Sequence, residues 1–221
     1  MDRPLDVFHQ SRLNQAKNAL ARNNFESFVV SGAGAAKTFI LEELIPRLMR
    51  EESCRVASFG GSMSLVHSGI YEGVKAVEGL EVLDTYDTSR PRFEVLRVRR
   101  EALLADIFLT GINAVTEDGK LVNLDGTGNR VAAMAFGPRF VIAVAGRNKL
   151  VPTVEDAMRR VKDLAAPLNA MRLDRKTPCT KTMHCEDCTS PERICNTWAI
   201  TEKSWPKNRI KVVLVDQELG F

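Results

Sequence analysis

Four cysteines near the C-terminal end of the sequence are the residues whose type and spacing most directly indicate chemistry. Cys179, Cys185, Cys188 and Cys195 follow the pattern Cys-x5-Cys-x2-Cys-x6-Cys within 17 residues. Four thiolates held together repel one another unless a cation shares their charge, so in a reducing compartment this grouping predicts a metal site. The irregular spacing favours a [4Fe–4S] cluster over zinc, although it does not match the bacterial ferredoxin run. His184 is a candidate substitute ligand, and zinc or a set of unliganded thiols are the alternatives.

The expected compartment follows from the lack of targeting signals. The first residues have no apolar stretch of the signal-peptide kind, and no run approaches the ~18 apolar residues of a membrane span. We therefore expect a cytoplasmic protein without a membrane partner, in which disulfides are disfavoured. The net charge of +3 is too small to indicate a nucleic-acid partner, and the arginines between residues 90 and 100 are typical of a solvated helix face.

A glycine-containing turn, Gly60-Gly61-Ser62-Met63-Ser64, lies between a predicted strand and a predicted helix. Glycines allow several backbone N–H groups to face one point, and a helix N-terminus adds partial positive charge there. Gly60, Gly61, Ser62 and Ser64 are therefore candidate ligands for a phosphate or carboxylate. A purely steric need for glycine at such a turn is an equally good explanation.

A second group of polar residues follows the buried strands in the middle of the chain. Open α/β sheets place their ligands at the ends of such strands. Glu117 and Asp118 are candidate acid–base residues, but Asp118-Gly119 is also what a tight hairpin turn requires. Arg130, Arg147 and Lys149 are candidates to hold an anionic substrate, unless they are simply solvated. The remaining candidate substrate-binding residues are Asn113, Asp125, Gly126, Asn129 and Asn148.

Two common nucleotide-binding motifs are not matched. Residues 31–38 (SGAGAAKT) resemble a P-loop, but Ala36 stands where that motif needs its second glycine. No Gly-x-Gly-x-x-Gly turn follows the first predicted strand, so hydride transfer by this chain alone is not expected.

The hydrophobic pattern predicts strands that alternate with helices. Helical spacing covers residues 5–23 and the stretch after Thr153, while short apolar runs predict strands at 25–30, 54–59, 105–110, 139–145 and 210–215. A hairpin is expected at residues 116–124, and residues 166–208 are expected to be mostly irregular. The sequence thus predicts one α/β domain, residues 1–221, with a mixed but mainly parallel sheet flanked by helices. Residues 177–200 form a cysteine-bearing excursion from it.

Taken together, several sequence blocks resemble the LUD-domain (lactate-utilisation) family in its short single-domain form. They are GGSMS at 60–64, residues 105–138, VAGRNKLV at 144–151, and PCTKTMHCEDCTSPERICN at 178–196. The resemblance implies a fold similar to the sugar-phosphate isomerase and CoA-transferase superfamily, with the ligand over the strand ends near a glycine-rich turn. Relatives usually carry an acidic residue soon after GGSMS, whereas this chain has His67 there.

The resemblance also implies alternatives for function. One is an accessory or substrate-binding subunit in the iron–sulfur-dependent oxidation of lactate or a related 2-hydroxy acid, with iron–sulfur or dehydrogenase subunits as partners. The other is a binder of, or enzyme for, a small phosphorylated or CoA-linked metabolite, with a purely structural metal site. Both imply an anionic small-molecule ligand, and neither establishes catalysis by this chain alone.

Overall fold

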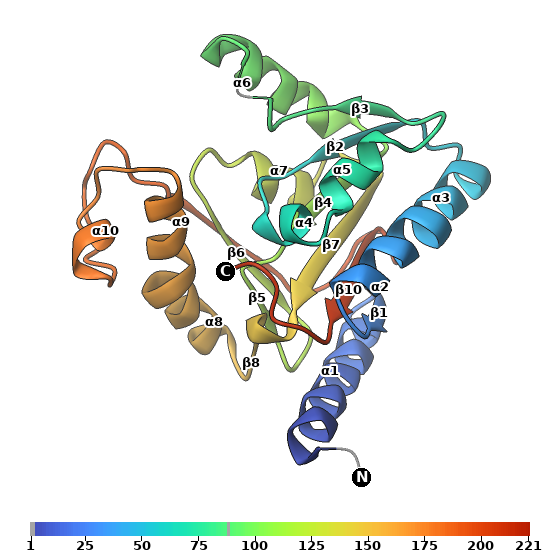
Figure 1. Ribbon diagram of the computed structural model, residues 1–221, viewed down its shortest axis with the longest axis horizontal. Coiled ribbons are helices and arrows are strands. Elements are labelled where there is room, and N and C mark those ends of the chain that lie inside the picture. The colour runs from blue at the N-terminus through green and yellow to red at the C-terminus, as the bar shows by residue number, and fades with distance from the viewer. Residues whose placement is uncertain (1–2, 88) are drawn as a thin grey trace.

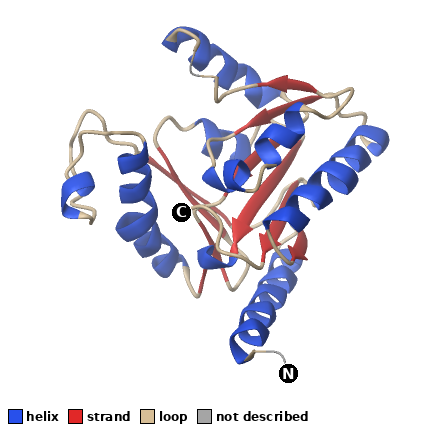
Figure 2. Ribbon diagram, in the orientation of Figure 1, coloured by secondary structure: helices blue, strands red, loops and turns tan. Residues whose placement is uncertain are grey.

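The computed structural model describes residues 3–87 and 89–221. Its centre is a six-stranded parallel sheet in the order β1-β10-β7-β4-β2-β3. The strands are β1 Glu26–Val30, β2 Val56–Phe59, β3 Glu81–Leu83, β4 Ile107–Gly111, β7 Phe140–Gly146 and β10 Ile210–Val215. The α/β class and the parallel sheet flanked by helices are confirmed (Figure 2).

The described helices are α1 Pro4–Arg22, α2 Ala33–Thr38, α3 Ile45–Glu51, α4 Met63–His67, α5 Ile70–Lys75, α6 Arg92–Glu101, α7 Asn129–Ala135, α8 Val154–Arg160, α9 Ala166–Arg172 and α10 Cys179–Thr182. Helices α2 to α5 cover one face of the parallel sheet, and α1 and α7 cover the other. A π-helical segment, Phe39–Leu44, joins α2 to α3. The backbone is helical without a break from α2 to α3, and Pro46, which has no N–H to donate, lies just after the π-helical segment.

Alternating residues of each strand build two separate cores. In β7, Ile142 and Val144 pack with α2 to α5, while Val141 and Ala143 pack with α1 and α7. This period of two is that of a strand buried on both faces, which explains the continuous apolar run of β7 and β10.

A second sheet contains the predicted hairpin. It has the order β8-β5-β6-β9, with strands β5 Ala114–Thr116, β6 Leu121–Asp125, β8 Leu150–Val151 and β9 Thr197–Thr201. The hairpin strands β5 and β6 are antiparallel, but they lie outside the parallel sheet, contrary to the single mixed sheet expected from sequence. One face of this sheet contributes Val115 and Leu121 to the core of α1, and the other packs against α8.

The two sheets diverge at two points of the chain. Strand β4 passes into β5 through residues 112–113, and β7 passes into β8 through the single 3-10 turn Arg147–Lys149. Both points lie at the carboxyl ends of parallel strands, where open α/β sheets form their ligand crevices. Figure 1 shows α8, α9 and α10 grouped on the side of the molecule away from α3, with the end of β10 leading into the space between α9 and α4.

The segment expected to be irregular is more ordered than its composition indicates. It contains α9, α10 and β9, the last of which pairs with the whole of β6. The expectation failed because four of the nine prolines and four of the five cysteines fall in this segment and indicate loops, whereas the pairing of β9 depends on a partner strand some 75 residues away. No helix in the described part of the chain combines the length and apolarity needed to cross a membrane.

Candidate ligand-binding site

A cavity of about 340 Å³ opens where the two sheets diverge. This volume lies in the range of sites for small molecules. The predicted site residues that line it are Gly61, Ser62, Asn113, Asp125, Gly126, Asn129, Arg130 and Lys149. They come from the ends of β2, β4, β6 and β7, so the structure brings together residues that are up to 88 positions apart.

The floor of the cavity depends on the close approach of Gly60 to the neighbouring strand. A Cβ atom on Gly60 would lie 2.8 Å from Thr110 Oγ1 and 3.0 Å from the Phe108 ring. These distances are too short for any larger residue, so the steric explanation for this glycine holds whether or not the turn binds a ligand. The turn then carries Ser62, whose side chain caps α4 by accepting a hydrogen bond from the Leu65 N–H at 3.4 Å.

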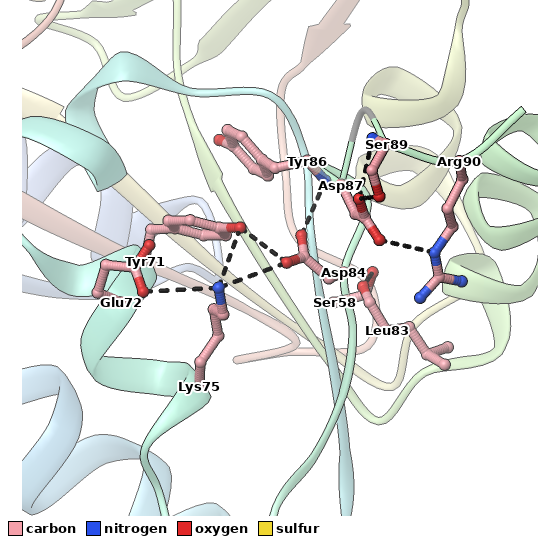
Figure 3. Close-up of polar contacts among 10 residues, drawn as sticks. All are labelled: Ser58, Tyr71, Glu72, Lys75, Leu83, Asp84, Tyr86, Asp87, Ser89 and Arg90. Carbon is pink, nitrogen blue, oxygen red and sulfur yellow. Dashed lines mark hydrogen bonds and ion pairs between the residues drawn. The ribbon is translucent and has the colours of Figure 1, made fainter. Parts of the chain in front are cut away.

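Tyr86 fixes the glycine turn from the other side. Its hydroxyl accepts a hydrogen bond from Ser62 N–H at 2.5 Å and donates to the Gly60 carbonyl at 3.1 Å. Figure 3 shows the segment that carries it: Ser58 donates to Leu83 O, and the Asp84 carboxylate accepts from the Tyr86 backbone N–H. Burial raises the pKa of Tyr86 to about 12. Because the Ser62 N–H already donates to the Tyr86 hydroxyl, it is not free to bind a ligand.

Asp125 likewise has a structural role. Its Oδ1 accepts from Gly126 N–H at 2.9 Å, and its Oδ2 accepts from the N–H groups of Arg130 and Val131 at 3.0 and 3.3 Å. These bonds satisfy the free N–H groups at the start of α7. The loop of residues 125–130 is thus folded around its own carboxylate, and the N–H groups of Gly126, Arg130 and Val131 are not free to bind a ligand.

Positive side chains give the cavity its chemical character. Five cations line it: Arg99, Arg130, Lys149, Arg172 and Arg175. Among the described residues, none of the five pairs with a carboxylate; their partners are neutral groups, such as Asn113 Oδ1 at 2.9 Å from Arg130 and Asn169 Oδ1 at 2.8 Å from Arg172. Asp125 is the acidic residue of the lining, and both its oxygens accept backbone bonds.

Arg130 and Lys149 lie deepest among these cations. Burial lowers the pKa of both, and that of Lys149 falls to about 7. Arg99, Arg172 and Arg175 come from α6, the end of α9 and the loop after it. Arg172 and Arg175 are exposed at the rim. Sequence inspection missed these three because they lie in polar helix ends and loops that give no local sign of where their side chains converge.

Four predicted site residues lie outside the lining. Gly60 lies directly behind Gly61, and Ser64 is buried and in contact with Lys149. Asn148 binds the C-terminal segment through the Leu219 N–H and the Gly220 carbonyl. Glu117 lies elsewhere on the surface, where it accepts from Arg12 of α1 at 2.7 Å.

Three further candidate residues also lie outside the cavity lining. Arg147 pairs with Asp216 at 3.1 Å, Asp118 lies beside Lys120 in the hairpin turn at 3.4 Å, and His67 is exposed on α4 away from the cavity lining. The structure therefore gives the acidic candidates Glu117 and Asp118 no position from which to act on a ligand in this cavity.

The cysteine-bearing excursion forms part of the cavity wall. Ile194 lines the cavity, and Asn196 donates from its backbone N–H to Asp125 O at 2.9 Å and from Nδ2 to Gly126 O at 3.1 Å. Gly126 permits this contact, because a Cβ there would lie 3.1 Å from the Ile194 backbone. The excursion is thus attached to the loop that begins α7.

Arg193 holds the excursion together from within. Its guanidinium donates to the carbonyls of Cys188 at 2.6 Å and Cys195 at 3.0 Å, and to the Asp187 carboxylate at 2.8 Å. Lys162 of the neighbouring helical segment donates to the same carboxylate at 3.0 Å. Two cations are therefore placed beside the thiols.

The thiols themselves are free and do not converge. Burial is the main cause of a raised pKa at Cys195, and the charges of Cys185 and Cys188 add to it, so these three lie within electrostatic range of one another. Cys179 instead contacts Thr177 Oγ1 at 3.2 Å. Among the described residues, no three Cys, His, Asp or Glu side chains are grouped closely enough to ligate a metal. The four thiols are the donor type that an iron–sulfur cluster or zinc requires, but the described side chains are not arranged as a ligand set.

Comparison with known proteins decides the family. The sequence profile described as "LUD domain" matches residues 13–215. The chain belongs to the LUD-domain family. A search of curated proteins gives no significant match for this LUD-domain protein.

One solved structure agrees at the level of the fold, and two others are more distantly similar. A DUF162-family protein from Deinococcus radiodurans superposes with a TM-score of 0.51 and 17% identity, over 94% of this chain and 98% of that one. A 5-methylthioribose 1-phosphate isomerase from Pyrococcus horikoshii has a TM-score of 0.32 and 11% identity, over 87% of this chain and 52% of that one. An eIF2B delta subunit from Chaetomium thermophilum has a TM-score of 0.31 and 20% identity, over 69% of this chain and 54% of that one.

Proposed function

We propose that this LUD-domain protein binds a small anionic metabolite, bearing a carboxylate or a phosphate, in the cavity between its two sheets. One observation carries the proposal: four arginines and Lys149 line the cavity, and the carboxylate of its lining is occupied by backbone N–H groups. Cations held together without counter-charges repel one another, and a bound anion relieves that repulsion. Lactate and related 2-hydroxy acids belong to this class of ligand, and so do sugar phosphates and CoA-linked metabolites.

Direct binding measurements test this proposal. Isothermal titration calorimetry is carried out with L-lactate, inorganic phosphate and ribose 5-phosphate, at low and moderate salt. We expect at least one of the three anions to bind, with an affinity that falls as salt rises. No heat and no thermal stabilisation with any of them would overturn the proposal.

Two rim arginines offer a clean perturbation of binding. Arg172 and Arg175 are exposed, so the double variant Arg172→Gln/Arg175→Gln should fold normally. Charge-assisted hydrogen bonds contribute about 1.5–3 kcal/mol, so loss of these two should weaken binding about tenfold or more. Arg50→Gln is the matched control, because Arg50 is equally exposed but lies at the end of α3, away from the cavity. Equal affinities of the double variant and the control would place the ligand elsewhere.

A role in iron–sulfur-dependent oxidation of a 2-hydroxy acid is a finer proposal. What supports it is the contact between the cysteine excursion and the cavity, through Ile194 and through Asn196 bound to Gly126. On this proposal the protein is the substrate-binding or accessory subunit, and its partner supplies the redox group. Co-purification with an iron–sulfur or dehydrogenase subunit, and tighter binding of L-lactate than of phosphate, are the expected results.

A further inference from the structure

Lys149 is a buried amine that opens onto the cavity. It ends the turn after β7, its side chain is 4% exposed, and that small exposed part belongs to the cavity lining. Among the described residues, no Asp or Glu forms an ion pair with it. Its Nζ instead donates to Ser64 Oγ at 2.8 Å. A buried ammonium without a counter-charge is costly, so this position favours the neutral amine.

The charged groups near Lys149 are both positive and disfavour its protonated form. Arg160 of α8 and Arg130 of α7 present positive charge to it, while α4 presents the Ser64 hydroxyl and the C-terminal segment presents backbone near Gly220. Arg160 donates to the carbonyls of Asn148 and Asn113, and its buried Nη2 has no hydrogen-bond partner among the residues that the structure describes. Its charge is therefore not neutralised, and together with burial it brings the pKa of Lys149 to about 7.

The hydrogen bonds of Ser64 leave the lone pair of Lys149 free. Ser64 Oγ donates its proton to the Leu219 carbonyl at 3.2 Å, so it accepts from Nζ and has no proton to give back. Ser64 is also fully buried and does not line the cavity. Of the two residues, only Lys149 is part of the cavity lining, so its amine is the candidate nucleophile and Ser64 is a positioning residue.

We infer that Lys149 is a catalytic amine that forms an imine with a carbonyl compound bearing a carboxylate or phosphate. This inference rests on the proposed anion-binding function, because the arginines of the cavity would hold the anionic group while the carbonyl carbon meets Nζ. In the step, the Nζ lone pair forms a C–N bond, the two amine protons and the carbonyl oxygen leave as water, and a C=N bond remains. No oxidant or reductant is needed. The imine, once protonated, draws electrons from the adjacent carbon, which is the chemistry required for isomerisation or cleavage next to a carbonyl group.

Reductive trapping tests the inference. The full chain is incubated at pH near 7 with pyruvate, dihydroxyacetone phosphate or acetone, and treated with cyanoborohydride. A trapped adduct adds the mass of the carbonyl compound less one oxygen, and peptide mapping locates it. We expect one adduct per chain, on Lys149, with pyruvate or dihydroxyacetone phosphate but not with uncharged acetone. The probe that reacts distinguishes a carboxylate-bearing from a phosphate-bearing substrate.

The pH profile and two variants separate this role from a merely structural one. At pH 7 about half of Lys149 is neutral at a pKa of about 7, against less than about one part in a thousand for an ordinary lysine, so its trapping should exceed that of surface lysines by about a thousandfold. Lys149→Met should abolish the adduct. Lys207→Met, which removes an exposed lysine, should leave it unchanged.

The outcomes also separate this inference from the proposed function. Anion binding by calorimetry without trapping on Lys149 by either charged probe overturns the imine and leaves the anion site standing. Failure of every anion to bind overturns both. Adducts spread evenly over surface lysines, at a rate that rises only above about pH 9, would also contradict the inference.

Discussion

Replacing Lys149 with methionine should stabilise the protein near neutral pH. Methionine has similar length, no charge and a flexible chain, so it can fill the space of the buried lysine. Ser64 keeps its bond to the Leu219 carbonyl in this variant, so no buried hydroxyl proton is left unpaired. The gain comes from removing a group that is protonated in the unfolded chain but resists protonation in the folded one.

The magnitude follows from the two pKa values of Lys149. The ordinary value is 10.5 and the folded value is about 7. Above pH 10.5, Lys149 is neutral in both the folded and the unfolded chain, so its burial does not lower the free energy of unfolding. As the pH falls from about 10 to about 7, the unfolded chain binds a proton that the folded chain does not, so the free energy of unfolding of the wild type falls by about 1.4 kcal/mol per pH unit. The total destabilisation by Lys149 reaches about 4 kcal/mol at pH 7. Below pH 7 this destabilisation stays constant.

Urea unfolding followed by circular dichroism measures this directly. We compare wild type, Lys149→Met and the surface control Lys207→Met between about pH 6 and pH 10. All other titrating groups are shared, so the difference between wild type and Lys149→Met isolates the lysine. We expect the variant to be more stable by about 3–4 kcal/mol at pH 7 and the two curves to converge towards pH 10. Parallel curves over this window would refute the burial argument.

Three further outcomes follow from other parts of the structure. Arg209→Met should lower the free energy of unfolding by about 3 kcal/mol in urea titrations, because the buried guanidinium donates to three carbonyls in and after α7 that would lose their partner. Glu117→Gln should change the free energy of unfolding by less than about 1 kcal/mol and leave anion affinity unaltered, because its pair with Arg12 is on the surface outside the cavity. A several-fold loss of anion affinity in this variant would contradict the proposed location of the binding site. If the four cysteines hold a cluster, anaerobically purified protein is brown with about four irons per chain, and Cys188→Ser loses them; colourless protein with stoichiometric zinc would exclude it.

The parallel sheet could be predicted because the hydrophobic pattern of each of its longer strands is recognisable in the sequence alone. The apolar runs of β7 and β10 are long enough to identify buried parallel strands, and Thr153 marks a helix start that the structure confirms. The placement of the hairpin in a second sheet could not be predicted from the sequence, because the turn Asp118-Gly119 determines only the pairing of β5 with β6. Which other strands join them depends on contacts between distant segments.

The candidate site could likewise be predicted from the sequence only in part. The glycine turn and Lys149 were identified because they follow strands, which sequence reveals. The contact between Lys149 and Ser64 spans 85 positions, and nothing local to either residue indicates it. Asp125 was read as a ligand-binding residue, whereas its oxygens close the first turn of α7. A carboxylate before a helix suits both roles, and only the bond pattern distinguishes them.

The divergence of the two sheets assigns different parts of the cavity to different parts of the chain. The floor comes from strand ends whose neighbours are fully buried, so substitutions there disturb the core. The walls come from α9, the loop after it and Ile194, whose lining side chains are exposed or half-buried. Substitutions of these side chains leave the parallel sheet untouched. On the proposed anion-binding function, differences in ligand preference among family members should therefore follow residues 166–196, while the floor of the cavity stays the same.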